Sequence, residues 1–222
     1  PIGPVFLNEP LSGLQKACED LEYVQLVNEA AKCPKGSKER MMFMTAFVVS
    51  SYSSVAYRTK KPFNPLLGET YERYDPATGV RFLSEKVVHH PTTLAMVAEG
   101  NGWRYEADVI LKSKFWGRSI EITPHGVLRV SFADGESFQW HKVVSSIHNL
   151  IIGKLYIDHY GTMRIKSSRA ATKPMVSMIF LVRNQFEVTP SCAKGMPKGA
   201  SASATMKSQW RANSHPPAMA GP

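Results

Sequence analysis

The sequence predicts an α+β fold, in which N-terminal helices precede an antiparallel β-meander that closes into a barrel or a sandwich. Three observations support this prediction. Apolar residues repeat at helical spacing within residues 1–57. Short segments that alternate apolar and polar residues follow between residues 58 and 168. Two tight-turn dipeptides, Asn101-Gly102 and Asp134-Gly135, separate several of these segments.

Two helical regions are expected near the N-terminus. Asn8 is interpreted as the N-cap of the first, whose apolar stripe runs from Leu11 to Ala30 with a bend on the way. Ser37 caps the second, which we expect over residues 38–57. This helix is apolar on nearly all sides, which predicts that it is buried. Its methionines indicate ordinary core packing, and the lining of an adaptable apolar cavity is the alternative.

The remaining elements are strands, except for one connection and the tail. The expected strands are 70–74, 81–88, 92–99, 103–111, 115–123, 127–132, 137–143, 162–166 and 175–182. Residues 146–157 indicate an irregular connection that leads into a strand, and Asp158–Gly161 indicates a turn. Residues 190–222 lack periodicity and are rich in small and polar residues, which predicts disorder.

These patterns divide the chain into three parts. Residues 1–57 form a helical segment, residues 58–168 form the core of the barrel, and residues 169–222 form an atypical C-terminal tail, of which residues 190–222 are expected to be disordered. The chain starts without an initiator Met, which indicates a fragment or a processed end.

Composition narrows the class of protein. The chain has 222 residues, 43% of them hydrophobic, and a formal net charge of +9. Much of this charge lies after residue 166, where the only acidic residue is Glu187, so the basic balance is poor support for nucleic-acid binding. Three scattered cysteines do not form a disulfide framework and favour a reducing compartment. No apolar run reaches the length of a membrane span. We therefore expect a cytoplasmic protein that meets membranes peripherally.

Two proline-containing stretches carry the polar groups of a candidate site. They are residues 60–69, KKPFNPLLGE, and residues 85–92, EKVVHHPT. Proline restricts its own backbone and that of the residue before it, so nearby donors lose little entropy when they bind a bulky anion. The donors that match a phosphomonoester are Lys61, Asn64, His89 and His90. The alternative interpretation is two partly exposed histidines at the end of a strand.

Other chemistries have weaker support. No histidine pair has the helical spacing of zinc enzymes, and no nucleophile elbow or phosphate-binding glycine loop occurs, so we expect no metal, no cofactor and no catalysis. Lys112, Lys114 and Arg118 flank the aromatic pair Phe115-Trp116. We interpret these charges as protection of a sheet edge, and contact with an anionic membrane is the alternative.

The two stretches resemble the hallmarks of one family, the oxysterol-binding protein-related lipid-transfer proteins. The family signature Glu-(Lys/Gln)-x-Ser-His-His-Pro-Pro stands here as residues 85–92, and residues 61–69 are similar to a second hallmark. The resemblance covers roughly residues 5–168, and residues 158–163, DHYGTM, are similar to plant-type members. Val88 replaces the serine of the signature and Thr92 replaces its second proline.

The resemblance implies an incomplete antiparallel barrel around a hydrophobic tunnel that holds one sterol or one phosphatidylinositol 4-phosphate. Family members move these lipids between membranes, often at membrane contact sites, and we expect this chain to do so as a monomer. The residues that would hold the inositol phosphate are Lys61, Asn64, His89 and His90, and those that would line the tunnel entrance are Pro62 and Phe63.

Two further parts of the family pattern are not recognised in the sequence. The lid of the tunnel is expected to be absent or reduced to residues 1–9, and no family-like C-terminal region is recognised after residue 168. A phosphoinositide sensor or scaffold that binds lipid without transfer is therefore the alternative function.

Overall fold

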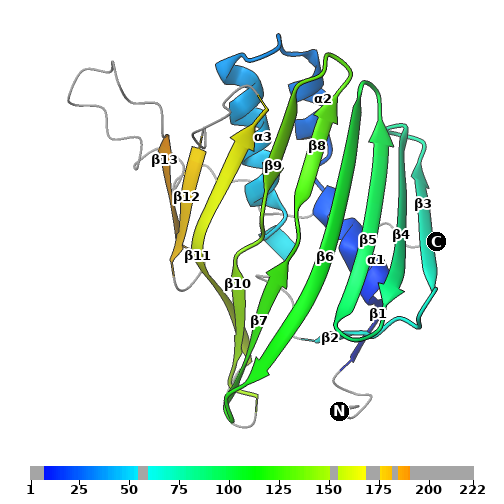
Figure 1. Ribbon diagram of the computed structural model, residues 1–222, viewed down its shortest axis with the longest axis vertical. Coiled ribbons are helices and arrows are strands. Elements are labelled where there is room, and N and C mark those ends of the chain that lie inside the picture. Colours follow the sequence, from blue (N-terminus) through cyan, green and yellow to red (C-terminus); the bar gives the residue numbers. More distant parts are fainter. Residues whose placement is uncertain (1–7, 55–59, 151–154, 169–175, 182–184, 191–222) are drawn as a thin grey trace, which may run out of the picture.

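Short helices near the N-terminus are followed by a long run of antiparallel strands (Figure 1). The computed structural model describes residues 8–54, 60–150, 155–168, 176–181 and 185–190. The helices are α1 (Gly13–Cys18), the 3-10 turn η2 (Glu19–Leu21), α2 (Gln25–Lys32) and α3 (Lys38–Ser50). The strands are β1 (Asn8–Ser12), β2 (Lys61–Phe63), β3 (Thr70–Asp75), β4 (Val80–Val88), β5 (Thr92–Gly100), β6 (Trp103–Phe115), β7 (Ser119–His125), β8 (Leu128–Phe132), β9 (Ser137–Trp140), β10 (Val144–His148), β11 (Tyr156–Ser167), β12 (Val176–Leu181) and β13 (Gln185–Pro190).

The main sheet curves part of the way round to a barrel. Nine of its 11 strands follow the order β13-β12-β11-β10-β7-β6-β5-β4-β3, and the other two, β8 and β9, make a second connection between β6 and β11. The short strands β1 and β2 pair in parallel as a separate two-stranded sheet. The helices lie on one face of the curved sheet (Figure 1). This arrangement confirms the predicted class, an α+β fold with an incomplete antiparallel barrel.

The strands β7 and β8 pair with two successive segments of the same strand, β6. Ile110 of β6 is opposite His125 of β7, and Ala107 is opposite Leu128 of β8, so the register continues across the break. The break is at Gly126, whose φ is +115°, and a Cβ there would lie 1.7 Å from the carbonyl oxygen of Asp108. Only glycine fits this close approach, which lets one strand bend as the sheet curls.

The helical region follows the prediction except at its ends. The N-cap of α1 is Ser12, not Asn8: the Ser12 Oγ atom accepts a hydrogen bond from the Gln15 amide at 3.3 Å, and the Gln15 side chain accepts one from the Ser12 amide at 2.8 Å. This reciprocal pair forms a capping box, which Asn8 in β1 has no means to form. Ser37 caps α3 as predicted, with its Oγ atom 3.1 Å from the Arg40 amide nitrogen.

Helix α3 is shorter and more exposed than its composition suggests. It ends at Ser50 instead of continuing to residue 57, and residues 55–59 lie outside the described part. Met42 is 69% exposed whereas Met44 is fully buried, so the helix is buried on one side and not all round. Met44 belongs to the core cluster, in agreement with the core-packing interpretation of the methionines.

Three strand predictions need correction. Phe115 ends β6 and does not start the next strand, which begins at Ser119. Asp158–Gly161 is not a turn, because β11 runs through it, paired with β10 and, from Gly161, with β12. Part of the predicted irregular connection forms β10. The strand predicted over residues 175–182 is confirmed as β12, and β13 was not predicted. The predicted turns at Asn101-Gly102 and Asp134-Gly135 are confirmed between β5 and β6 and between β8 and β9.

The core lies between the helices and the concave face of the sheet. Phe47 of α3 packs edge-on against Tyr105 and Trp140, with ring centroids 6.5 and 6.2 Å apart. The gap that borders these three rings leaves no room for a water molecule, so the tunnel is not seen here and remains a prediction for other parts of the concave face. None of the helices that the structure describes has both the length and the apolar composition to cross a bilayer.

Candidate functional site

The first predicted stretch forms β2 and a turn that is fastened to β4. Leu66 donates its amide to the Glu69 Oε2 atom at 2.7 Å, and Glu69 donates its own amide back to the Leu66 carbonyl oxygen at 3.1 Å. Two backbone hydrogen bonds then join the turn to Lys86, from the Gly68 amide at 2.9 Å and to the Glu69 carbonyl at 3.1 Å. Pro65 is buried against Gly13, where an added Cβ would meet its ring at 3.2 Å. The turn is therefore held by β4 through Lys86 and by α1 through Gly13.

Lys86 links the two predicted stretches, and the sequence interpretation did not select it. Its side chain is fully buried, and its Nζ atom donates to the Asn64 Oδ1 atom and the Pro65 carbonyl oxygen, each at 2.8 Å. Burial lowers the pKa of Lys86, and the negative charge of Glu69 partly opposes this effect. Because its oxygen accepts from Lys86, the Asn64 side chain presents its amide nitrogen, a hydrogen-bond donor, on the exposed side.

A signal for Lys86 was present in the sequence. Along β4 the buried residues alternate strictly with exposed ones, and Lys86 takes the fourth buried position after Val80, Phe82 and Ser84. A lysine on the apolar side of an alternating strand is rare unless polar groups satisfy its ammonium, so its presence there indicates such partners nearby.

The two histidines form the turn between β4 and β5. The register of the pair shifts between Lys86 and Val88, and β4 ends at Val88, so the strand alternation no longer separates His89 from His90. Their rings lie with centroids 4.4 Å apart at an interplanar angle of 69°. The Thr92 hydroxyl, which stands where the family signature has proline, contacts the His89 carbonyl oxygen at 3.4 Å. The Thr92 hydroxyl thus takes the place of the signature proline in supporting the histidine turn.

The electrostatics of this turn suit an anion. The positive charge of Lys86, followed by slight burial and the charge of His90, lowers the pKa of His89. This lowering favours the neutral imidazole in the free protein, and an incoming anion would favour its charged form. The site combines a buried ammonium with two exposed imidazoles, which can donate hydrogen bonds to an anion.

The other predicted site residues lie on β2. Lys61 is exposed at its start, and within the described part of the chain no hydrogen bond joins its ammonium to either imidazole. Pro62 is half-buried, and Phe63 is 45% exposed. The structure therefore connects Asn64 to the histidine turn through Lys86, and it places Lys61 on β2, in the separate two-stranded sheet.

An apolar row lies on the inner face of the sheet near the same end. It consists of Ile120, Ile147 and Ile157, which are directly opposite one another in register on three adjacent strands. Two residues further along, His159 packs against Tyr52 at 4.7 Å, which identifies this face as the side of the helices. The three isoleucines are only half-buried, because α2 and α3 lie toward the other end of the sheet (Figure 1). We call Ile120, Ile147 and Ile157 the inner row.

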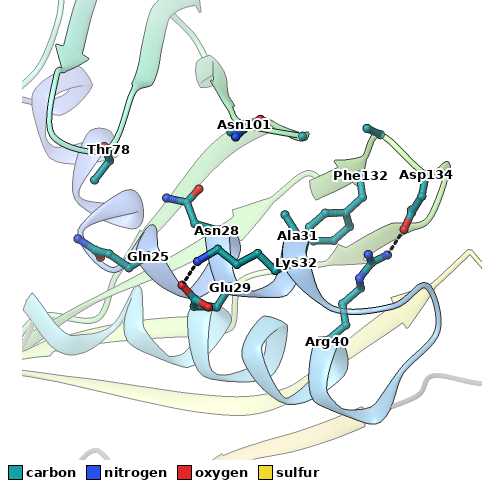
Figure 2. Close-up of a pocket in the computed structure, with 12 residues that line it drawn as sticks. Gln25, Asn28, Glu29, Ala31, Lys32, Arg40, Thr78, Asn101, Phe132 and Asp134 are labelled. Carbon is teal, nitrogen blue, oxygen red and sulfur yellow. Dashed lines mark hydrogen bonds and ion pairs between the residues drawn. The ribbon is translucent and has the colours of Figure 1, made fainter.

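A cavity at the opposite end has the wrong chemistry for a lipid. It has a volume of about 570 Å³ and lies between α2, the start of α3 and the turns after β5 and β8. Figure 2 shows that amide and charged side chains line it, among them Asn28, Lys32 and Asn101. Arg40, at its edge, forms an ion pair with Asp134 at 2.6 Å. We interpret this cavity as a hydrated groove between helices and turns.

Comparisons with known proteins place the chain in a family. The family model described as oxysterol-binding protein matches residues 3–214. The chain is 53% identical to oxysterol-binding protein-related protein 2B of Arabidopsis thaliana over 168 residues, which are 75% of this chain and 24% of that protein. It is 47% identical to human oxysterol-binding protein-related protein 7 over 168 residues, 75% of this chain and 20% of that protein. The chain thus spans about a quarter or less of the length of these relatives.

Two crystal structures are similar to this fold. The Osh3 ORD of Saccharomyces cerevisiae in complex with PI(4)P has a TM-score of 0.71 and 33% identity, and the match covers 81% of this chain and 52% of that one. The Osh1 ORD domain in complex with cholesterol has a TM-score of 0.76 and 33% identity, and the match covers 86% of this chain and 47% of that one.

Proposed function

The chain belongs to the oxysterol-binding protein family, and from this premise we propose that it binds one sterol or one phosphatidylinositol 4-phosphate and transfers the lipid between membranes. Within this proposal the protein works in the cytoplasm, at the surfaces of organelle membranes and at their contact sites. It contacts anionic membranes peripherally, acts as a monomer and makes or breaks no covalent bond.

One observation carries the proposal more than any other. The Asn64–Lys86 pair and the histidine turn present polar donors at one end of the sheet, and the inner row presents an apolar surface close by. Thr92 of β5 is opposite Leu111 of β6, and β6 is next to β7, so two strand spacings separate the histidine turn from Ile120. Ile120 is also opposite Phe115, four residues beyond Leu111 along β6, so the separation is roughly 16 Å. A ligand with a phosphorylated head and an apolar body fits such a pair of surfaces.

The energetics explain why the polar groups would decide selectivity. Moving an acyl chain or a sterol from a bilayer into the protein exchanges one apolar environment for another, so apolar burial gives little net drive. A hydrogen bond to a charged group contributes roughly 1.5–3 kcal/mol net. Contacts from Lys61, Asn64, His89 and His90 to a phosphate would therefore distinguish a phosphoinositide from an uncharged lipid. Pro62 and Phe63 would line the entrance beside them.

A transfer assay between two vesicle populations tests the proposal. Donor vesicles carry a fluorescent sterol or phosphatidylinositol 4-phosphate, and acceptor vesicles carry a sensor that reports arrival of the lipid. The proposal expects arrival at a rate proportional to protein concentration. Extraction of lipid without arrival would support the alternative of a sensor or scaffold, and the absence of both would contradict the proposal. Mass spectrometry of lipids that co-purify with the protein would identify the natural ligand.

A further inference from the structure

The hairpin between β6 and β7 reaches beyond the histidine turn. Strand β5 begins at Thr92, which is opposite Leu111, and the last four residues of β6 pair only with β7. At about 3.3 Å per residue, Phe115 stands roughly 13 Å beyond the level of Thr92, the first residue of β5. Figure 1 shows this hairpin as the lowest point of the sheet, at the same end as the turn between β4 and β5.

The tip of this hairpin is both aromatic and basic. Phe115 and Trp116 are 65% and 57% exposed. The Lys114 ammonium lies 3.9 Å from the centroid of the Trp116 ring, and Arg118 follows in the turn. A positive φ of 78° at Gly117 closes the turn, and the Trp116 amide donates to the Ser119 carbonyl oxygen at 2.9 Å. We call Lys114, Phe115, Trp116 and Arg118 the hairpin tip.

Edge protection, which we favoured from the sequence, explains the basic residues of the hairpin tip but not its aromatic residues. Lysines at the open side of a strand discourage pairing with another chain, and β6 is open on its β5 side after Leu111. Two adjacent exposed aromatic rings have the opposite effect, since they favour association. An aromatic pair framed by cations instead matches the interface of an anionic bilayer, where aromatic rings and basic side chains are both stabilised.

A second exposed apolar surface, in addition to the hairpin tip, lies on the other side of the histidine turn. Leu66 and Leu67 are 74% and 63% exposed. They belong to the turn that is hydrogen-bonded to Lys86. The hydrogen bonds of this turn fix its backbone, so the two leucines are exposed on an ordered loop. The hairpin tip and this leucine pair thus stand at the same end of the molecule as the candidate phosphate site.

We propose that the hairpin tip and the leucine pair dock the protein on the surface of an anionic bilayer, with the histidine turn between them facing the headgroups. Interfacial side chains enter a bilayer by about 5–10 Å. A tip that projects roughly 13 Å therefore brings His89 and His90 to the level of the lipid phosphates. The biological role of this docking rests on the proposed function, but docking itself requires no ligand in the phosphate site.

The test uses vesicles that contain phosphatidylcholine and phosphatidylserine but neither sterol nor phosphoinositide. Trp116→Ser is expected to weaken binding to these vesicles at least about tenfold, because binding scales with the apolar area that enters the interface. Tyr74→Ser is the matched control, since Tyr74 is 59% exposed and has the Arg81 guanidinium 5.6 Å from its ring centroid, but lies next to the β3–β4 turn. It is expected to leave vesicle binding unchanged.

Fluorescence locates the contact. Trp103 and Trp140 are buried, with 4% and 3% exposure. The chain has four tryptophans, so the difference between the emission of the wild type and that of Trp116→Phe is used to isolate Trp116. This difference is expected to shift to the blue on addition of anionic vesicles. Double substitution of Lys114 and Arg118 by Gln is expected to remove the preference for phosphatidylserine over phosphatidylcholine alone.

A separate measurement distinguishes docking from lipid binding. Dioctanoyl phosphatidylinositol 4-phosphate is soluble and tests the phosphate site without a membrane. Trp116→Ser is expected to bind it like the wild type, and His89→Ala with His90→Ala is expected to lose it while still docking on phosphatidylserine vesicles. Unchanged vesicle binding by Trp116→Ser would overturn the inference. So would a dimer in sedimentation velocity that this substitution abolishes, since the tip would then join two copies of the chain.

Discussion

The Lys86 Nζ atom lies 2.8 Å from the Asn64 Oδ1 atom, across 22 residues of sequence. This contact places a buried cation behind an exposed amide, so the polar end of the candidate site has a defined shape before any ligand arrives. A preset donor loses less conformational entropy on binding than a mobile one. Substitution of Lys86 tests this relationship directly.

Replacement of Lys86 by Met is expected to weaken binding of dioctanoyl phosphatidylinositol 4-phosphate by about tenfold, the effect of losing one charged hydrogen bond. Methionine keeps the length of the side chain but releases Asn64 and the Pro65 carbonyl. Hydrogen exchange of residues 66–69 is expected to become faster at the same time. Lys166→Met, at an exposed position of β11, is the control. Unchanged affinity in Lys86→Met would show that Asn64 needs no support.

Replacement of His89 and His90 by Ala is expected to reduce extraction of phosphatidylinositol 4-phosphate from liposomes by at least about tenfold. Sterol binding is expected to fall much less, because a sterol has no phosphate to contact the imidazoles. His125→Ala, which removes an exposed imidazole at the end of β7, is the matched control. An equal loss of both lipids would contradict the assignment of the imidazoles to the phosphate.

Phosphoinositide binding is expected to take up protons near neutral pH. The charge of Lys86 lowers the pKa of His89 in the free protein, and a bound phosphate raises it again. Affinity should therefore increase as the pH falls from about 8, until protonation of the phosphate near pH 6 limits the gain. Titration calorimetry in buffers of different ionisation enthalpy measures this uptake. Lys86→Met removes the main cause of the shift and should reduce the uptake.

The sequence was sufficient for the strands whose side chains alternate and for turns that glycine encodes. Strands β4 to β6 and the hairpins at Asn101-Gly102 and Asp134-Gly135 follow directly from these local signals. Strands β1 and β2 were missed because they pair in parallel across about 50 residues of chain and contain proline, so neither one shows an alternation. The turn predicted at Asp158–Gly161 was wrong because pairing with two neighbouring strands overrides the local preference.

The site was predictable as a set of donors but not as a connected arrangement. His89, His90 and Asn64 were selected because prolines restrict the chain beside them. Lys86 was not selected, because a charged residue in a strand is ordinarily assigned to the solvent side. Its buried place depends on a turn 20 residues earlier that supplies the Pro65 carbonyl. The alternation of β4 marks the buried position of Lys86, but no local pattern identifies this long-range partner.

His159 is expected to make the protein sensitive to acid. Burial and then the charge of Lys142 lower its pKa to about 4, although Asp158 opposes the shift. The unfolded chain binds a proton near pH 6.5, so stability is complete above this pH and falls as the pH decreases to about 4. The loss amounts to at most about 3 kcal/mol.

The matching experiment compares the wild type with His159→Gln, which retains a group able to hydrogen-bond to the Ser145 hydroxyl, now 2.9 Å from the His159 Nδ1 atom. Urea unfolding at pH 7 and at pH 4.5 gives the free energy of unfolding of each protein. The wild type is expected to lose more stability than the variant between these pH values. Equal losses would show that His159 does not stay neutral in the fold.

The buried pair of Arg40 and Glu136 is expected to hold the start of α3 on the sheet. The Glu136 side chain is fully buried and accepts from the Gly36 amide at 2.8 Å, from Arg40 at 2.9 Å and from the Ser167 hydroxyl at 3.1 Å. Arg40→Met would leave this carboxylate without its cation and is expected to cost about 3–5 kcal/mol in the free energy of unfolding.

The double substitution of Arg40 by Met and Glu136 by Leu distinguishes the energy of the ion pair from that of the surrounding packing. It removes both charges together, so it is expected to be more stable than Arg40→Met alone, because no uncompensated charge remains in the interior. The free energies of unfolding of the wild type, the two single variants and the double variant form a cycle that gives the coupling energy. Additive losses would mean that the carboxylate finds enough support from Gly36 and Ser167, and that the ion pair is not what fixes α3.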